Sequence, residues 1–301
     1  MSVSSISTFG SVQTLLSNLN LVQNSLNDSQ QQISSGYKSQ TFEGISSDVE
    51  KLTSLNSQVS RLNNYQQQNG ITIGQLQTSN TSLGQIITAA TDIKSLIASQ
   101  ISGTSSSTSF SQQLSAKLSS IAATLNTNYG GKYIFGGTNT ASPPVQIPVP
   151  KSIITGIPDA GYYLGNSQDT ISRINDAQTI TPNVKANDIS FQNLIAGINQ
   201  ALSATGGDRA NTLKNAEDLV EKGLQGIIAL QANVNSNILT VQQANTQSQT
   251  LQTYYKGIVS NIIESDVVAL SAKVSQDTVV LQASYSTFSR ITQLTLSSYL
   301  K

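Results

Sequence analysis

The sequence predicts a mainly α-helical protein: an elongated antiparallel coiled-coil rod formed by N- and C-terminal helices, with a small β-rich insert in the middle of the chain. Apolar residues recur at seven-residue spacing near both ends, which is typical of helices with one narrow apolar seam. All six prolines lie between Pro143 and Pro182, among short apolar runs and turn signals. Charged residues make up only 11% of the chain, so neutral polar side chains supply most of its surface.

The first periodic segment runs from Val12 to Ile33. Two interleaved rows give it the 3-4 spacing of a coiled-coil helix, and Gly36 follows where a C-cap glycine is expected. Residues 34–47 then form a connection that contains Gly36 and Gly44. The seam of this segment consists of Val12, Leu15, Leu19, Val22, Leu26 and Ile33.

The second periodic segment, Val49 to Ile101, is longer. An unbroken helix over it would be about 80 Å long, whereas a compact globule of this chain length is only roughly 50 Å across. This comparison favours a rod. Asn69 lies inside one heptad row, where a polar residue weakens the seam but can fix its register. That row consists of Leu55, Leu62, Asn69, Leu76, Leu83, Ala90 and Ile97.

Helical patterning resumes on both sides of the proline-rich region. A shorter helix around Leu114 ends near Asn128, and another begins near Phe191 and stops at Gly206-Gly207. A long helix starts near Asp208, and its heptad row is Leu213, Val220, Ile227, Val234 and Val241. The last helix carries a seam formed by Val267, Leu270, Val274, Leu281, Phe288 and Ile291.

These segments divide the chain into three predicted regions. Residues 1–45 and 265–301 form a terminal coiled-coil assembly domain, 46–138 and 190–264 a helical rod, and 139–189 a β-rich surface insert without which the rod is expected to fold. The terminal seams could bury each other within one chain or pack against neighbouring chains. Because two helices that share one seam are only marginally stable, we predict that these seams form an assembly interface.

The composition excludes several functions. Basic and acidic residues balance at 16 each, so neither a nucleic-acid partner nor a polybasic membrane contact is expected. No apolar run approaches the length of a membrane span. Cys and His are absent, which removes the usual metal ligands and the commonest catalytic base. We therefore expect no cofactor and no enzymatic activity. The first 27 residues carry no charge and no secretory signal, so any export would use a route without a cleaved peptide.

Two groups of residues partly resemble functional motifs but do not match them. Glu43, Asp48 and Glu50 lack the residue order of a calcium loop, and the dipole at a helix N-terminus explains them better. The stretch from Gly130 to Thr138 lacks the spacing of a phosphate-binding loop. We interpret it as a turn followed by a short aromatic strand.

Three stretches together resemble the flagellin superfamily. Ile33-Ser34-Ser35-Gly36-Tyr37-Lys38 looks like the I-S-[ST]-G-basic signature of flagellins and their hook-associated relatives. Gly131-Lys132-Tyr133-Ile134-Phe135-Gly136-Gly137-Thr138 resembles the G-x-Y-x-F-x-G-T element of the hook–filament junction family, and the segment from Tyr285 to Leu300 is similar to that family's closing segment. The chain departs from the family in having no proline shortly after the first signature.

The resemblance implies a structural subunit that connects the flagellar hook to the filament. Its implied partners are copies of itself, a larger hook-associated protein, flagellin and an export chaperone, and its implied location is the extracellular flagellum, reached by type III export. Flagellin itself, the bulk filament subunit, is the first alternative. A secreted coiled-coil adhesin is the second, although the internal repeats or membrane anchor typical of adhesins are not visible in the sequence.

Overall fold

The computed structural model describes residues 3–103, 107–150 and 155–299, and it confirms a mainly α-helical fold with a small insert. The chain divides into two compact units. Unit 1 combines Met1–Ser60 with Leu251–Lys301, and unit 2 is Arg61–Thr250. Two long helices, α2 (Val49–Ile101) and α5 (Arg209–Ile263), contribute residues to both units.

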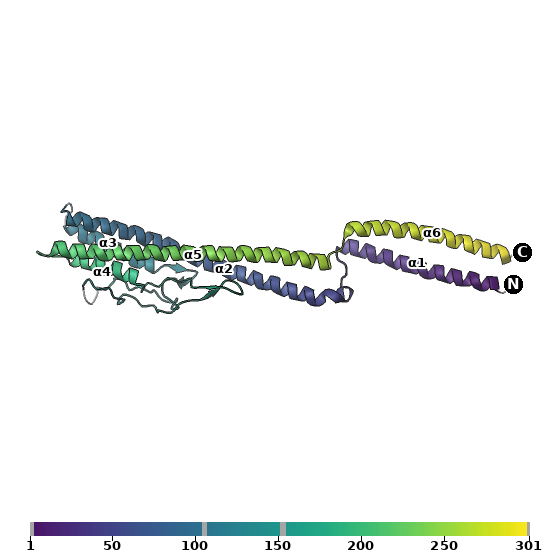
Figure 1. Ribbon diagram of the computed structural model, residues 1–301, viewed down its shortest axis with the longest axis horizontal. Helices are drawn as coiled ribbons and strands as arrows, with labels where there is room; N and C mark the ends of the chain where they lie inside the picture. Colours follow the sequence, from purple (N-terminus) through teal and green to yellow (C-terminus); the bar gives the residue numbers. More distant parts are fainter. Residues whose placement is uncertain (1–2, 104–106, 151–154, 300–301) are drawn as a thin grey trace. The chain divides into compact units, whose positions relative to one another are not determined.

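Unit 1 contains the two terminal helices and the connection between the first of them and α2. Helices α1 (Val3–Ser35) and α6 (Val267–Tyr299) lie side by side and antiparallel (Figure 1). Between α1 and α2 the chain forms a 3-10 helix, η1 (Phe42–Asp48). The α1 helix begins before the predicted seam, which starts at Val12, and α6 continues beyond the predicted seam, which ends at Ile291.

Unit 2 is built on the heptad rows of α2 and α5. The helix α3 (Ser107–Leu125) and the helix α4 (Ile189–Ser203) complete its helical part. The predicted rows are buried from Leu62 to Ile97 on α2 and from Leu213 to Val241 on α5, and their apolar members from Leu76 onward belong to one hydrophobic cluster. The heptad assignment of these helices is therefore confirmed, and α2 continues through Gly70, Gly74 and Gly84 without a break.

Two glycines let α4 and α5 approach each other closely. A Cβ atom on Gly223 of α5 would lie 2.7 Å from the backbone nitrogen of Leu194, and one on Gly197 of α4 would lie 2.9 Å from the carbonyl oxygen of Ala216. Real Cβ atoms essentially never approach so closely, so these positions require glycine for packing even though glycine lowers helix propensity.

A short hairpin follows α3. Strands β1 (Asn128–Tyr129) and β2 (Lys132–Tyr133) pair antiparallel across Gly130 and Gly131, whose φ angles are +59° and +84°. Two successive positive φ angles favour a tight hairpin turn that glycine forms without strain. The predicted turn and aromatic strand are thus confirmed.

The insert is mostly irregular among its described residues. Its one regular sheet pairs β3 (Ser172–Arg173) with β4 (Thr179–Ile180). Several of its side chains nevertheless lie in the same core as the helices, which changes the expectation that the helices fold independently of it. The insert residues in this core are Val145, Tyr162, Ile174, Val184 and Ala186.

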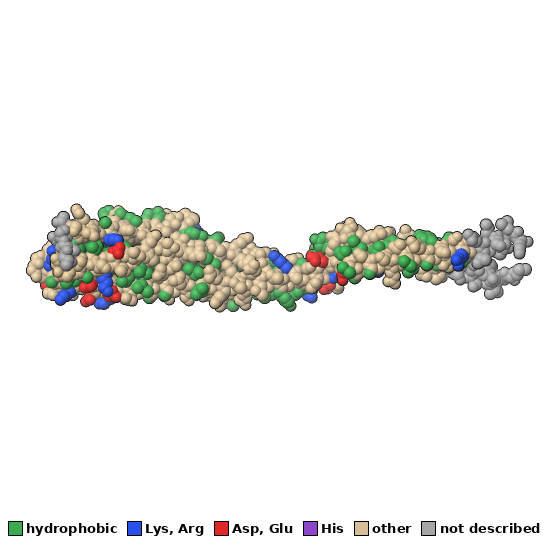
Figure 2. Space-filling view, turned by 90° about the horizontal axis from the view of Figure 1, so that it is seen from above, with side chains coloured by type: hydrophobic (Ala, Val, Ile, Leu, Met, Phe, Trp, Pro, Cys, Tyr) green, Lys and Arg blue, Asp and Glu red, His purple; other side chains and the backbone are tan. Residues whose placement is uncertain are grey.

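The surface carries few charges. Figure 2 shows neutral side chains over most of the visible face, with acidic and basic side chains gathered at a few places. Over the described ranges, no helix has both the length and the hydropathy that a membrane crossing requires.

Candidate assembly interface

The predicted terminal seams meet within one chain. Leu19 of α1 and Leu281 of α6 are buried, with exposed fractions of 7% and 8%. Val267, at the first turn of α6, is 44% exposed and contributes little to the pair. The other predicted residues are half-buried: Val12, Leu15, Val22, Leu26, Ile33, Leu270, Val274, Phe288 and Ile291.

Because the two seams pack against each other within one chain, only part of the apolar surface of each seam remains accessible to other chains. In an antiparallel pair each helix covers one face of the other, so the most buried leucines are already used inside the chain. The half-buried residues keep part of their apolar surface accessible. The role of the seams in assembly remains a prediction.

A polar cluster, which the heptad pattern did not reveal, lies across the α1–α6 contact. Ser25 donates a 3.0 Å hydrogen bond to Asp277, and the Lys273 ammonium contacts Ser25, Ser29 at 3.3 Å and Asp277 at 3.3 Å. Ser29 is 2% exposed. A buried polar contact in a coiled coil favours the register that satisfies it, because other registers leave its groups unpaired. The i, i+4 spacing of Lys273 and Asp277 was the available signal in the sequence.

The I-S-S-G signature has a structural role at the end of this helix pair. Gly36 ends α1 with a φ angle of +75°, which a side chain would strain. The amide of Lys38 then donates to the carbonyl of Ile263 at 2.8 Å, and the amide of Ser265 donates to the carbonyl of Gly36 at 3.0 Å. These hydrogen bonds connect the C-terminal end of α1 to the turn between α5 and α6. They hold the end of α1 close to the beginning of α6.

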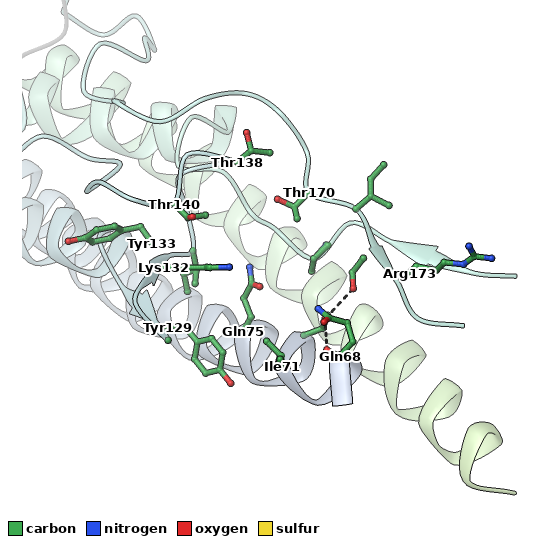
Figure 3. Close-up of a pocket in the computed structure, with 17 residues that line it drawn as sticks. Gln68, Ile71, Gln75, Tyr129, Lys132, Tyr133, Thr138, Thr140, Thr170 and Arg173 are labelled. Atoms are coloured by element: carbon green, nitrogen blue, oxygen red, sulfur yellow. Dashed lines mark hydrogen bonds between the residues drawn. The ribbon is translucent and has the colours of Figure 1, made fainter. Parts of the chain in front are cut away.

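The G-K-Y-x-F-G-G-T element lines a groove in unit 2. The groove has a volume of about 660 Å³ and lies between α2, the β1–β2 hairpin and β3 (Figure 3). The hydroxyls of Thr72 on α2 and Ser172 on β3 are 3.2 Å apart and join two of its sides. Figure 3 shows Lys132 and Gln75 directed toward each other across the groove.

The described lining of this groove is mostly neutral. Its charged lining residues are Lys132 and Arg173, and Arg173 donates to the backbone carbonyls of Asn175 and Asp176. The other described lining side chains are hydroxyls, amides, tyrosines and aliphatic groups, with no carboxylate among them to act as a general base. Within the described part of the chain, no cluster of three or more potential metal ligands occurs.

The same groove explains one of the α2 glycines. A Cβ atom on Gly74 would lie 2.0 Å from the hydroxyl oxygen of Tyr129, so the tyrosine lies directly over the helix at that point. The Tyr129 ring therefore occupies space that a side chain at position 74 would fill. The sequence showed this glycine only as a weak point of the helix.

Comparison with known protein families finds a match to the N-terminal helical part of this chain. Residues 6–140, which span α1, α2, α3 and the hairpin, match the bacterial flagellin N-terminal helical region. The class that the fold and the motifs define is thus a helical protein with a flagellin-type N-terminal region. No match was found among curated protein sequences.

Solved structures with a similar fold align over a larger part of this chain. A structure from Vibrio parahaemolyticus assigned as a flagellar hook-associated protein aligns with a TM-score of 0.58 and 13% identity, covering 70% of this chain and 95% of the other. FlgL of Bacillus cereus aligns with a TM-score of 0.57 and 17% identity, covering 68% of this chain and 98% of the other. The resemblance inferred from the sequence motifs is confirmed: this chain joins a flagellin-type N-terminal region to the fold of FlgL-type proteins.

Proposed function

We propose that this protein is a structural subunit of the bacterial flagellum that connects the hook to the filament. The observation that carries the proposal is the match of residues 6–140 to the flagellin N-terminal helical region, in a chain whose fold is that of FlgL. The paired terminal helices supply an apolar surface for assembly, and the low charge of the chain places little like-charge repulsion between copies.

The proposal extends to partners and location. Copies of this chain would contact one another, a larger hook-associated protein would lie on one side and flagellin on the other, and an export chaperone would hold the chain before export. The absence of cysteine suits an export route that carries unfolded chains, because no wrong disulfide can form. The protein would act in the extracellular flagellum, without a cofactor and without enzymatic activity.

A gene deletion tests this function. Cells without the protein should assemble hooks but no attached filaments, and flagellin should appear in the culture medium as unassembled subunits. A plasmid copy of the natural gene should restore the filaments. A deletion strain that keeps normal filaments would contradict the proposal, whereas a strain that contains no flagellin at all would indicate a role in flagellin production or export.

A further inference from the structure

The groove between α2, the β1–β2 hairpin and β3 contains positive charge that the chain does not neutralise. Lys132 on β2 is exposed, and none of the ion pairs or hydrogen bonds of the described residues engages its ammonium. Arg173 on β3 donates to two backbone carbonyls and forms no described ion pair. No carboxylate lines the groove, so it attracts an anionic group although the chain as a whole is neutral.

Neutral polar side chains of the groove also lack partners. Within the described part of the chain, no hydrogen bond engages the side-chain amides of Gln68 and Gln75 or the hydroxyls of Tyr133 and Thr140. Amides and hydroxyls both donate and accept hydrogen bonds. Figure 3 shows Gln75 directed from α2 toward Lys132, so an amide and the unpaired ammonium lie near each other in the groove. The groove therefore offers several side-chain hydrogen bonds to a ligand that carries hydroxyl groups.

The size and the apolar part of the groove fit a small ligand. Its volume of about 660 Å³ lies within the range of about 300–1,000 Å³ that is typical of small-molecule sites. Tyr129 and Tyr133 are half-buried in its lining, and their rings supply flat apolar surface beside polar hydroxyls. A sugar ring has hydroxyls around its edge and C–H groups on its faces, which matches this combination.

An extended peptide fits the groove less well. A peptide that adds a strand to a sheet needs a row of free backbone groups along an edge. Strand β2 pairs with β1 on one side, and on the other side the amide of Tyr133 donates to the carbonyl of Thr140 at 3.0 Å. Strand β3 has only two residues. Recognition in this groove thus depends on side chains rather than on a strand edge.

We propose that this groove binds a short saccharide that carries a carboxylate. The carboxylate pairs with Lys132, the sugar hydroxyls bond to Gln68, Gln75 and Thr140, and a ring face packs against Tyr133. A hydrogen bond from an ammonium to a carboxylate is stronger than one between neutral groups, so Lys132 selects acidic over neutral sugars. This binding activity is separate from the flagellar role, because every lining residue belongs to unit 2 and the terminal helices belong to unit 1.

Ligand-observed NMR titration of the purified full-length chain tests the proposal, because it detects even millimolar affinities. The acidic probes are trigalacturonate, a fragment of a uronate polysaccharide, and 3′-sialyllactose, which carries the terminal acidic sugar of cell-surface glycans. Galactotriose and lactose are their neutral counterparts. At least one acidic probe should bind about tenfold more tightly than its neutral counterpart. The acidic probe that binds identifies the source of the saccharide.

Three variants locate the binding in the groove. Lys132→Met should weaken binding of the acidic probe about tenfold and leave the affinity for the neutral sugar nearly unchanged. Gln75→Leu should weaken both about threefold or more, because it removes an amide that bonds to hydroxyls. Lys214→Met removes the same charge from an exposed position of α5 outside the groove and should change neither affinity. Circular dichroism spectra that match the natural chain show that each variant is folded.

The same titrations can contradict the proposal in three ways. If neither acidic saccharide binds the natural chain, the groove is not a saccharide site. Equal losses from Lys132→Met and Lys214→Met would show that only the general charge of the surface attracts the probes. A hexaglutamate peptide that binds as tightly as the saccharides, with the same dependence on Lys132, would overturn the saccharide assignment in favour of an acidic peptide.

Discussion

The side-chain amide of Asn69 on α2 donates a 2.9 Å hydrogen bond to the side-chain oxygen of Asn245 on α5. The same amide donates to the backbone carbonyl of Ile174 in the insert at 3.0 Å. Asn69 is fully buried in a row that is otherwise apolar within unit 2. One side chain thus joins the two long helices and the insert, and a slip of either helix would leave its amide unpaired in the core.

Replacing Asn69 should destabilise unit 2. Asn69→Ala would remove both hydrogen bonds and leave the carbonyl of Ile174 without this donor, which should lower the free energy of unfolding by about 1–3 kcal/mol. Urea denaturation followed by circular dichroism measures this. Asn64→Ala, on an exposed position of the same helix, should change the free energy by less than about 0.5 kcal/mol. Equal effects of the two variants would contradict a structural role for the buried amide.

The glycines of α5 should respond in opposite directions to alanine. At Gly223 the added methyl group would meet the backbone of Leu194, so Gly223→Ala should cost about 1–3 kcal/mol of stability. At Gly257 nothing lies within 4 Å of the new Cβ, and Gly257→Ala should stabilise the helix by up to about 1 kcal/mol through its higher helix propensity. Thermal unfolding of the two variants compares them. Stabilisation by Gly223→Ala would show that α4 and α5 are not held so closely.

The insert should be required for the stability of the helices in unit 2. Tyr162 is 2% exposed, and its hydroxyl donates a 2.7 Å hydrogen bond to the carbonyl of Ala186. Burial raises the pKa of Tyr162, so its hydroxyl remains a donor well into alkaline pH. Tyr162→Phe should therefore lower the free energy of unfolding by about 1–2 kcal/mol.

Replacing residues 139–189 by a Gly/Ser linker should have a larger effect, because it also removes the apolar contacts of Val145, Ile174 and Val184 with the core. The shortened chain should melt at a lower temperature and expose apolar surface that binds a hydrophobic dye. A shortened chain that unfolds as cooperatively as the natural one, at the same temperature, would show that the insert is a dispensable surface element.

The polar cluster between α1 and α6 should behave as a unit. Lys273→Met would leave the Asp277 carboxylate, 17% exposed, without its ammonium partner and should weaken the helix pair by about 1–3 kcal/mol. The double variant Lys273→Met/Asp277→Leu should recover most of that loss, because no unpaired charge remains. Hydrogen exchange of the α1 backbone amides reports the stability of the pair. If the double variant is weaker than the single one, the cluster stabilises the pair by more than charge pairing.

Much of this architecture could be predicted from the sequence because seven-residue spacing is a strong local signal. The boundaries of α2 and the buried row from Leu62 to Ile97 follow directly from it. The pairing of Leu19 with the α6 seam inside one chain did not, because a heptad row indicates that a helix has a partner without naming the partner.

The missed features depend on contacts between distant segments. In the sequence, Gly223 looks only like a residue that weakens a helix, and its role in packing depends on its contact with α4. Asn69 likewise looks only like a polar residue in an apolar row, and its role depends on its hydrogen bonds to Ile174 and Asn245. The exposure of Val268 and Val279 on α6 was also missed, since these valines fall outside the seam and the sequence does not distinguish them from other surface residues. Such features need the packing of the folded chain, which local spacing does not encode.

The most direct measurement of the central claim is the number of copies of this protein per hook as filament length varies. Flagella sheared to different lengths can be isolated with their hooks, and quantitative mass spectrometry then gives the ratios of this chain and of flagellin to the hook protein. A junction subunit should keep a constant ratio to the hook protein while the flagellin ratio falls with filament length. A ratio for this chain that falls in proportion to filament length would contradict the junction role and identify the protein as a filament subunit.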